Sequence, residues 1–520
     1  MSNVKKVASS DNSSDRKDPS VSAEPYVEEI SKIQQAAGEL DGSDITELEF
    51  KTVLRKLDYV LMPLMCVVVL LQFLDKTSLN YANLLGIQKD THLKGQEYSW
   101  LGSMFYFGYL AASPVHGWCL QKFDLPKYTA FTILTWGTIL GLHAACQNFG
   151  GLVACRFLLG WFEAGITPAF ILLTGRFYKR SEQVTRTSIW FSMNGYAQIL
   201  GGGISYGVQI KKPGPIAVWR ELYLILAGIT IAFGIVCFIF MPSSPATIRY
   251  LDERQRLIAV FRIKENKSGI HDTTYKRYQV VEAFKDVRIY LFFLGVCTAN
   301  IANGGVTNFG SVIIKQFGYD TKQSALLGMV PGLSECVAIY VGAYVAYKTN
   351  SRAIPGVLCF MVAIAGGVMM IAIPPAQKVA RMAGYALVFW YPCASPFYYS
   401  WLSSSVSGTS KRIAFNVFLQ LGYSVGNLLG AQTYRVKDAP DYIPAKITLI
   451  AMFAASSLCL IAISAVHYYW NRKKTSAAAE SGLSTKSVEL GGGESENQEA
   501  SAEDLSDLTD KERPTFRYPY

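Results

Sequence analysis

Long apolar runs with almost no charge dominate this sequence and limit what it can fold into. A helix needs about 20 mostly apolar residues to cross a bilayer, and runs of this kind recur along most of the chain. Only 17% of the residues are charged, whereas soluble domains carry about 25%. The pattern excludes an ordinary soluble enzyme and a disordered protein, and it predicts an all-α, polytopic membrane protein.

Reading the apolar runs as helices predicts twelve membrane spans in two groups of six. The spans are expected at about 57–78, 97–119, 127–147, 150–175, 185–209, 219–241, 289–314, 322–347, 353–373, 380–403, 411–433 and 444–470. Each half also has a glycine at a helix end followed by spaced cations, after the second and the eighth span. Two related six-helix halves are typical of secondary transporters of the major facilitator type.

Five segments follow from this division. Residues 57–241 and 288–470 are expected to form the N-terminal and C-terminal six-helix bundles, joined by a cytosolic central loop over 242–287. Residues 1–56 and 471–520 are rich in Ser, Glu, Asp and Lys. Because such segments are too polar to bury a core, they are expected to be disordered cytosolic tails.

The formal net charge of +10 is explained by topology rather than by nucleic acid. The basic residues form short clusters between apolar runs, and with a cytosolic N-terminus nearly every cluster falls on the cytosolic side. We therefore expect a multi-pass protein, most simply of the plasma membrane, with both termini in the cytosol. The first 50 residues lack the apolar segment of a cleavable signal peptide.

No pattern typical of an enzyme is visible. The five histidines are scattered, the ten cysteines include no CxxC pair, and neither a nucleophile with its base nor a phosphate-binding loop is recognisable. We expect no enzyme activity, no metal and no cofactor. A membrane sensor is also disfavoured, because the polar tails are too short to be expected to form a large folded domain.

The first and fourth predicted spans each carry two ionisable residues in their interior, where charge is costly unless it is paired or faces a cavity. Asp75 and Lys76 are adjacent in the first span, so they project differently, one towards a neighbouring helix and the other towards a cavity. Arg156 and Glu163 are seven residues apart in the fourth span, so they share a helix face at a separation of roughly 10 Å. Either the four residues form static ion pairs, or the carboxylates carry protons and the cations hold an anionic substrate.

Other polar residues in the spans are weaker candidates. Asn194 and Gln198 lie one turn apart in the fifth span, and Asn303 lies in the seventh with two further asparagines. Their amides either donate to a substrate or hold helices together. Tyr391 lies in an aromatic span broken by prolines, where a gate or a pocket wall is expected. Glu335, in the eighth span, is expected to be structural.

Several long blocks, in order, resemble the fungal allantoate permease family. They are FLDKTSLNYANLLGIQKDTHLKGQEYSWLGSMFYFGYL, RFLLGWFEAGITPAFILLTGRFYKRSEQVTRTSIWFSMNGYAQILGGGISYG, ANGGVTNFGSVIIKQFGY and GYSVGNLLGAQTY followed by DAPDYIPAKITL. That family is similar to the anion:cation symporter group of the major facilitator superfamily. The resemblance covers about residues 50–470 and implies twelve helices, proton symport, and small organic anions or ureido compounds as substrates.

Matched position by position, the resemblance implies that Asp75 and Glu163 carry protons. It implies that Lys76 and Arg156 anchor the anion. One stretch departs from the family pattern: residues 111–117 read AASPVHG, without the expected acid or amide and with the proline displaced. This departure puts the identity of the substrate in question.

Two hypotheses about transport follow. The first is proton-coupled uptake of a carboxylate, ureido acid or vitamin-like acid by alternating access, driven by the proton gradient. The second is proton-linked export of an acidic secondary metabolite. In either case the expected partners are a small organic anion, protons and the lipid bilayer, without nucleic acid, and the transporter is expected to work as a monomer.

Overall fold

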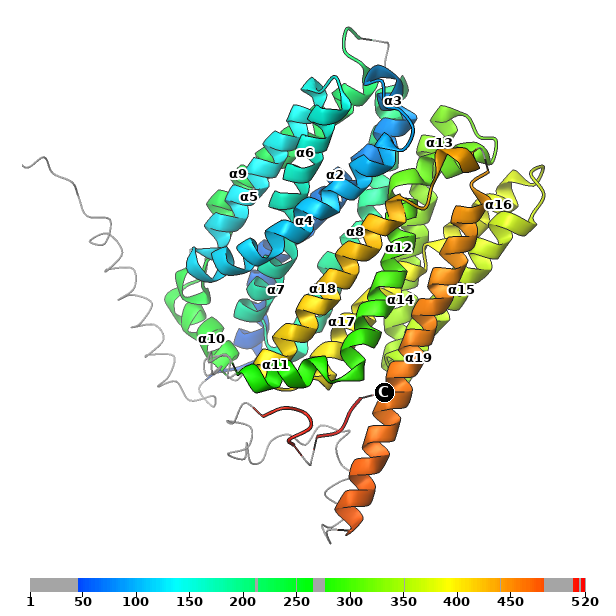
Figure 1. The fold of residues 1–520 in the computed structure, drawn as a ribbon. Coiled ribbons are helices and arrows are strands. Elements are labelled where there is room, and N and C mark those ends of the chain that lie inside the picture. The colour runs from blue at the N-terminus through cyan, green and yellow to red at the C-terminus, as the bar shows by residue number, and fades with distance from the viewer. Residues whose placement is uncertain are drawn as a thin grey trace, which may run out of the picture.

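The chain forms a bundle of long helices, with no strand among the described residues (Figure 1). The computed structural model describes residues 45–210, 214–248, 250–264, 276–349, 351–439, 441–480, 508–513 and 516–519. Helix α3 lies at one end of the bundle, and α10 and α11 lie at the other. These ends are called the α3 end and the α11 end below.

The N-terminal half contains the predicted first six spans. Its helices are α2 (Glu47–Leu84), α3 (Ile87–Asp90), α4 (Glu97–Lys122), α5 (Leu125–Leu142), α6 (Phe149–Glu163), α7 (Ile166–Phe177), α8 (Arg180–Ile210) and α9 (Val218–Phe240), with the short 3-10 turn η2 (His143–Ala145). The predicted fourth span is therefore two helices, α6 and α7, which meet at Ala164 and Gly165.

The C-terminal half contains the other six predicted spans. Its helices are α12 (Val287–Gln316), α13 (Thr321–Leu327), α14 (Met329–Thr349), α15 (Ala353–Ala372), α16 (Lys378–Val388), α17 (Ala394–Ser405), α18 (Thr409–Ala431) and α19 (Ile443–Glu480), with the turns η4 (Tyr391–Cys393) and η5 (Val436–Asp438). The predicted tenth span is interrupted at η4, next to Pro392, as its prolines indicated.

Among the described residues, eight helical stretches are long and apolar enough to cross a membrane. The predicted spans outside this set correspond to α4, α5, α8 and the α16–α17 pair, which lie in the bundle with the others (Figure 1). For these four, membrane crossing remains a prediction. Each of the twelve predicted spans nevertheless coincides with a helix or with two helices in succession.

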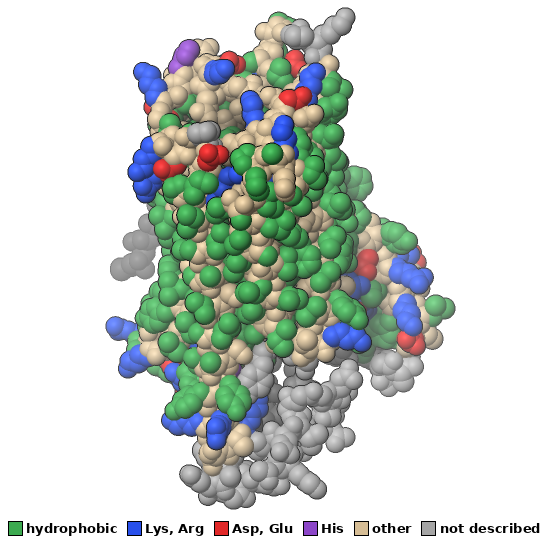
Figure 2. Space-filling model, turned by 90° about the vertical axis from the view of Figure 1, so that its right-hand side faces the viewer, with side chains coloured by type: hydrophobic (Ala, Val, Ile, Leu, Met, Phe, Trp, Pro, Cys, Tyr) green, Lys and Arg blue, Asp and Glu red, His purple; other side chains and the backbone are tan. Residues whose placement is uncertain are grey.

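The surface agrees with a membrane setting. Figure 2 shows hydrophobic side chains covering the middle of the face formed around α15 and α19, with charged side chains gathered towards its two ends. Leu358 and Met361 on α15 and Leu458 and Ile461 on α19 are each at least 44% exposed. In water such a wide apolar surface would be unfavourable, whereas lipid tails would cover it.

The two helices of the central segment pack against different halves. Helix α10 (Glu253–Lys264) faces the N-terminal half, where Arg262 forms an ion pair with Glu182 of α8 at 2.6 Å. Helix α11 (Arg277–Phe284) faces the C-terminal half, where Glu282 pairs with Lys411 of α18 at 2.9 Å. The segment therefore connects the two halves, with one of its helices on each.

Both predicted tails carry more structure than expected. Thr46 and Glu49 form a reciprocal capping box that starts α2 ten residues before the predicted span. At the other end α19 continues to Glu480, and residues 508–513 and 516–519 lie against the C-terminal half. The remaining tail residues lie outside the described part of the chain.

Small residues allow α12 and α18 to touch. A Cβ placed on Gly426 or Gly430 of α18 would overlap the carbonyl oxygens of Cys297 or Ile301 on α12. Gly304 of α12 lies equally close to the backbone of Asn427. Small residues commonly allow such close approach between helices in membranes.

Candidate functional site

A cavity of about 760 Å³ lies between the two halves. Side chains from α2, α4, α6 to α8, α12, α14, α17 and α18, together with η4, line it. At the α11 end the lining includes exposed residues such as Tyr347, which is 83% exposed, and Ser403. At the α3 end the lining residues Tyr81, Ser311 and Tyr385 are buried. The cavity therefore opens at the α11 end.

Helix α4 seals the α3 end by hydrogen bonds to the opposite half. The Tyr98 hydroxyl donates to the carbonyl oxygen of Asn308 at 2.7 Å, and Ser103 Oγ donates to that of Leu428 at 3.0 Å. Nearby, the backbone N–H of Ser311 donates to Asn80 Oδ1 at 2.9 Å. These bonds join α2 and α4 to α12 and α18.

Lys76 places a positive charge in the cavity without an acidic partner. Its ammonium donates to the Tyr423 hydroxyl at 3.1 Å and lies 5.1 to 5.7 Å from the ring centres of Phe73, Tyr106 and Tyr423. No described carboxylate lies within ion-pair distance of it. Aromatic faces stabilise a cation without neutralising it, so Lys76 can attract an anion that enters the cavity.

Glu163 contributes a carboxyl group to the same cavity, at the point where α6 ends. The residue is 1% exposed, and its Oε1 has no described hydrogen-bond partner. Its backbone carbonyl accepts from Gln72 at 3.1 Å, which fixes the end of α6 against α2. A buried carboxyl group with an unused oxygen is a candidate proton carrier.

Asp75 lies outside the cavity lining and is fully buried within the N-terminal half. Its Oδ2 accepts from Trp136 Nε1 at 2.9 Å and from Thr230 Oγ1 at 3.1 Å, so α5 and α9 supply its partners. Its Oδ1 has no described partner. The adjacent Asp75 and Lys76 thus point to a neighbouring helix pair and to the cavity, as their different projections suggested.

Arg156 also lies outside the cavity lining. It is 2% exposed, and its guanidinium donates to the Tyr223 hydroxyl at 2.5 Å and more weakly to Ser78 Oγ at 3.4 Å. The Tyr223 ring stacks on His143 at 4.9 Å. Arg156 and Glu163 do share a buried face of α6, but only Glu163 reaches the cavity. None of the four intramembrane charges forms an ion pair with a described residue, so static ion pairing is not what this structure shows.

The amide candidates all reach the cavity, together with Tyr391. The Tyr391 hydroxyl donates to Asn303 Oδ1 at 2.5 Å, and Asn303 Nδ2 donates to Asn427 Oδ1 at 2.7 Å. These two residues therefore both line the cavity and connect α12, η4 and α18. Asn194 also lines the cavity.

Gln198 connects the two halves through Glu335, which the sequence predicted to be structural. Its amide donates to the carboxyl group of Glu335, which lies on α14 and is 2% exposed. Glu335 lines the cavity, and so does Arg352, whose Nε donates to Ser400 Oγ at 3.1 Å near the open end. Glu335 was detectable as a rare acid within an apolar run. Arg352 resembled one more cation of a connecting turn.

Among the described residues, no group of three or more His, Cys, Asp or Glu side chains lies close enough to hold a metal ion. The cavity instead combines two cations, Lys76 and Arg352, with two acids, Glu163 and Glu335, among amides and aromatic rings. Such a surface can bind a small polar molecule and can exchange protons with it.

Comparisons with known proteins agree with this architecture. Residues 65–431 match the family model of the Major Facilitator Superfamily. The chain is 35% identical over 505 residues to the allantoate permease of Saccharomyces cerevisiae, covering 95% of this chain and 90% of the relative. It is 34% identical over 481 residues to an uncharacterized transporter of Schizosaccharomyces pombe (92% and 91%), and 31% identical over 469 residues to a thiamine pathway transporter of Saccharomyces cerevisiae (90% and 86%).

Solved structures show the same fold at low sequence identity. A bacterial homologue of the human lysosomal transporter Spinster, described as inward-facing and occupied, aligns with a TM-score of 0.56 and 14% identity, over 79% of this chain and 96% of its own. The Escherichia coli xylose transporter, described as partially occluded and inward open, aligns with a TM-score of 0.55 and 11% identity, over 77% and 96%.

Proposed function

The chain belongs to the Major Facilitator Superfamily, and from this premise we propose that it is a proton-coupled importer of a small organic anion. It is a multi-pass membrane transporter rather than an enzyme. The observation that carries the proposal is the presence of Lys76 and Glu163 in one cavity without an ion pair between them. The cation is available to an anion, and the carboxyl group is available to a proton.

The substrate proposed is a compact carboxylate, ureido acid or vitamin-like acid. Lys76 supplies the charge that attracts its carboxylate, and the aromatic rings around Lys76 offer apolar contact. The amides of Asn194, Gln198 and Asn303 and the hydroxyl of Tyr391 suit a ureido or amide group, since they provide donors and acceptors at fixed positions. The likeness to an allantoate permease favours this class.

Electrostatics couples the anion to the proton in this proposal. An ionised Glu163 and a substrate carboxylate repel each other, and they also compete for the charge of Lys76. When Glu163 takes up a proton, the repulsion ends and the anion binds more tightly. Release of that proton on the other side of the membrane weakens binding and frees the substrate. The proton gradient is therefore the energy source.

Asp75 and Arg156 are buried within the N-terminal half, outside the lining of the cavity. Asp75 is buried against α5 and α9 with one oxygen free of described partners, so it is a second candidate proton site within the N-terminal half. Arg156 holds Tyr223 and Ser78, and through them α9 and α2. We assign Arg156 the positioning of these helices in place of direct contact with the substrate, in contrast to the role that the family resemblance implies.

The α11 end faces the cytosol in this proposal. Cations gather there, including Lys51, Arg186, Arg254, Lys348 and Arg412, as the positive-inside rule requires for a cytosolic face. The conformation is then open to the cytosol and sealed to the outside. The plasma membrane is the proposed location, and one chain encloses the whole cavity, so a monomer is sufficient for transport.

Uptake in a yeast strain that lacks related permeases tests the proposal. Radiolabelled allantoate is supplied at pH 5 and pH 7, with carboxylates, ureido acids and vitamins as unlabelled competitors. We expect uptake that increases at the lower pH and collapses with a protonophore. Cells preloaded with the label separate import from export, since proton-linked export would reduce retention. The proposal would be contradicted if the cells showed no competitor-sensitive uptake at either pH.

Glu163→Gln is the sharpest variant for the proton step. The amide has the shape of the acid but cannot release a proton, so accumulation against a gradient should disappear while exchange of internal for external substrate continues. Glu47→Gln, at the start of α2 and outside the cavity, serves as the control. Concentrative uptake by Glu163→Gln at the rate of the unmodified protein would remove Glu163 from proton coupling.

A further inference from the structure

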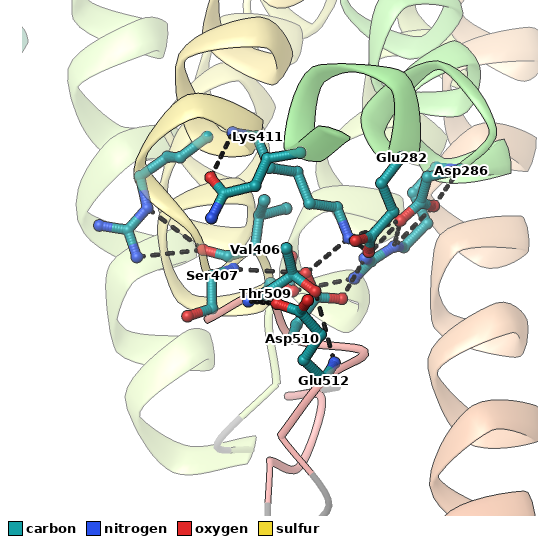
Figure 3. A network of polar contacts seen from close by, with 12 residues as sticks. Glu282, Asp286, Val406, Ser407, Lys411, Thr509, Asp510 and Glu512 are labelled. Atoms are coloured by element: carbon teal, nitrogen blue, oxygen red, sulfur yellow. Dashed lines mark hydrogen bonds and ion pairs between the residues drawn. The ribbon is translucent and has the colours of Figure 1, made fainter. Parts of the chain in front are cut away.

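Residues 508–519 contain a short segment that lies on the α11 end of the C-terminal half. The segment contacts a group of side chains that we name the basic cup, formed by Arg288 of α12, Lys411 of α18 and Lys474 of α19 with the acids Glu282 and Asp286. Figure 3 shows Asp510 pointing into this group from the C-terminal segment, opposite Lys411, Glu282 and Asp286.

Asp510 is the centre of the interaction. Its side chain is fully buried and forms ion pairs with Arg288 Nη2 at 2.6 Å and Lys411 Nζ at 2.7 Å. The Tyr518 hydroxyl donates to Asp510 Oδ2, the oxygen that pairs with Arg288, at 2.8 Å. Burial alone would raise the pKa of Asp510, but the charges of Arg288 and Lys411 outweigh it and lower the pKa to about 2. The carboxylate is therefore ionised when it is docked.

Main-chain contacts extend the docking beyond this carboxylate. Lys474 Nζ donates to the carbonyl oxygens of Asp510 at 2.7 Å and Arg513 at 2.8 Å. The Ser407 hydroxyl donates to the carbonyl oxygen of Leu508 at 3.0 Å. Thr509 is fully buried and accepts from the backbone N–H of Glu512 at 3.3 Å. The segment thus has a defined turn that fits its receptor.

A second anchor is Tyr518. Its main-chain carbonyl oxygen accepts from Asn471 Nδ2 at 2.8 Å, and its main-chain N–H donates to Asn471 Oδ1 at 2.9 Å. Its ring stacks on His467 at 5.2 Å. The neighbouring Pro519 carbonyl accepts from Trp401 Nε1 at 2.9 Å. Tyr518 is 2% exposed, which is unusual for a residue in a tail of this polarity.

The docked segment ties together helices that also seal the opposite end. Arg288 and Lys411 lie in the first turns of α12 and α18, and the same two helices accept the sealing bonds from α4 at Asn308 and Leu428. A ligand that spans several elements binds well only when those elements have the matching arrangement, so binding stabilises that arrangement.

We propose that residues 508–513 and 516–519 are an intramolecular ligand of the basic cup whose docking favours the conformation that is open at the α11 end. The proposal uses only the alternating-access part of the proposed function and does not depend on the substrate. In alternating access the α11 end must close while the α3 end opens. Undocking is then expected to shift the balance towards the form that is open at the α3 end.

Two measurements on the purified full chain test this. Hydrogen–deuterium exchange of the peptide around Tyr518 reports docking. Cysteine labelling with N-ethylmaleimide, quantified by mass spectrometry of the peptide that carries the new cysteine, reports the conformation. Ser403→Cys marks the open α11 end and Ser311→Cys marks the sealed α3 end, since Ser403 is exposed and Ser311 is 1% exposed.

Asp510→Asn removes the charge and keeps the size. Tyr518→Ala removes the ring that stacks on His467 and the hydroxyl that donates to Asp510, and it leaves the main-chain bonds to Asn471 in place. Each should speed exchange of the segment at least threefold, halve or further slow labelling at Ser403→Cys, and at least double labelling at Ser311→Cys. Asp504→Asn removes one charge from the same tail, at a position outside the described residues, and should change neither measurement.

Opposite shifts at the two marker positions support the proposal, because general loosening would speed labelling at both. Faster exchange of the segment with unchanged labelling at both positions would overturn it, as would a parallel increase at both. Unchanged exchange in both variants would overturn the docking itself. Because no substrate is added, a negative uptake experiment would leave this result unaffected.

Discussion

Lys76 and Glu163 share a cavity but remain separate, and this arrangement defines the chemistry at the scale of single residues. Lys76 is held by rings and by one hydroxyl group, so its charge is stabilised and still unneutralised. Glu163 lies at the end of α6, and its Oε1 has no described hydrogen-bond partner. An anion and a proton can therefore be taken up at nearby positions without breaking an ion pair.

Lys76→Gln should weaken substrate binding by one to two orders of magnitude. The glutamine keeps most of the length and loses the charge, and a charged hydrogen bond is worth about 1.5–3 kcal/mol, which is roughly 10- to 100-fold in affinity. The half-saturation concentration for uptake measures the effect. Lys348→Gln, an exposed cation outside the cavity, is the control. Equal half-saturation values in Lys76→Gln and the unmodified chain would exclude Lys76 as the anchor.

Tyr223→Phe tests the positioning role of Arg156. Loss of the hydroxyl removes the 2.5 Å bond from the buried guanidinium, and leaving a buried charged donor without its partner costs about 1–3 kcal/mol or more. We expect a lower midpoint of thermal unfolding with little change in the half-saturation concentration. Tyr468→Phe, at an exposed position on α19, provides the comparison. A large increase in half-saturation with unchanged stability would instead place Arg156 at the substrate.

The residue-scale predictions from sequence were incomplete for a physical reason. Helical periodicity places Arg156 and Glu163 on one face, but it cannot say which neighbouring helix covers each part of that face. Tyr223 of α9 covers Arg156, and the cavity lies beside Glu163. The position of Arg352 in the cavity could not be predicted either, because the sequence of a short turn does not show whether its cation faces solvent or the mouth of a cavity.

At the scale of elements, the contact between α12 and α18 holds the C-terminal half together. Glycines on both helices allow backbone atoms to touch where lipid gives no hydrophobic driving force. Any side chain at these positions would have to push the helices apart.

Gly430→Ala should therefore destabilise the bundle. Its Cβ would overlap the Ile301 carbonyl oxygen, and such overpacking costs typically about 1–3 kcal/mol. Gly117→Ala on α4 is the matched control, since a Cβ there meets nothing within 4 Å. We expect a lower unfolding midpoint and a lower yield of folded protein for Gly430→Ala only. Equal stability of the two variants would show that the helices separate without cost.

Most elements could be predicted from the sequence, because each apolar run is a local property. The break between α6 and α7 could not, because it lies where Gly165 packs closely against His116 of α4, a contact between residues remote in sequence. The docked segment was missed because its composition is polar. Its visible signals were Phe516, Tyr518 and Tyr520, the aromatic residues of a tail that is otherwise polar.

At the scale of the whole molecule, the segment 508–519 and the proposed proton site should respond to different pH ranges. The docked pKa of Asp510, about 2, lies below its ordinary value because Arg288 and Lys411 outweigh burial. A depressed pKa means that docking is stabilised above the ordinary value of about 4 and is lost as the pH falls towards 2. The acids Asp286 and Glu282 also lie beside these cations. Within the segment Tyr518 contacts Asp510, and from α19 Lys474 and His467 contact the segment.

Between pH 5 and pH 8, exchange protection of the peptide around Tyr518 should therefore stay constant once intrinsic exchange rates are corrected for pH. Acid-driven uptake over the same range would then arise elsewhere in the molecule. Asp510→Asn removes the titrating group, so any pH dependence common to it and the unmodified chain belongs to another residue. A loss of protection centred near pH 6 would contradict the prediction.

The bonds that seal the α3 end have a consequence for how such a transporter can change. On the α4 side Tyr98, Ser99 and Ser103 provide the donors, while the acceptors are main-chain carbonyl groups of Asn308, Tyr434 and Leu428. Every amino acid carries that carbonyl group, so mutations at the acceptor positions leave the bonds available. Residues such as Asn194 and Tyr391, which line the cavity, take no part in them. Selectivity can therefore drift, in evolution or by design, while the barrier against leakage is inherited unchanged.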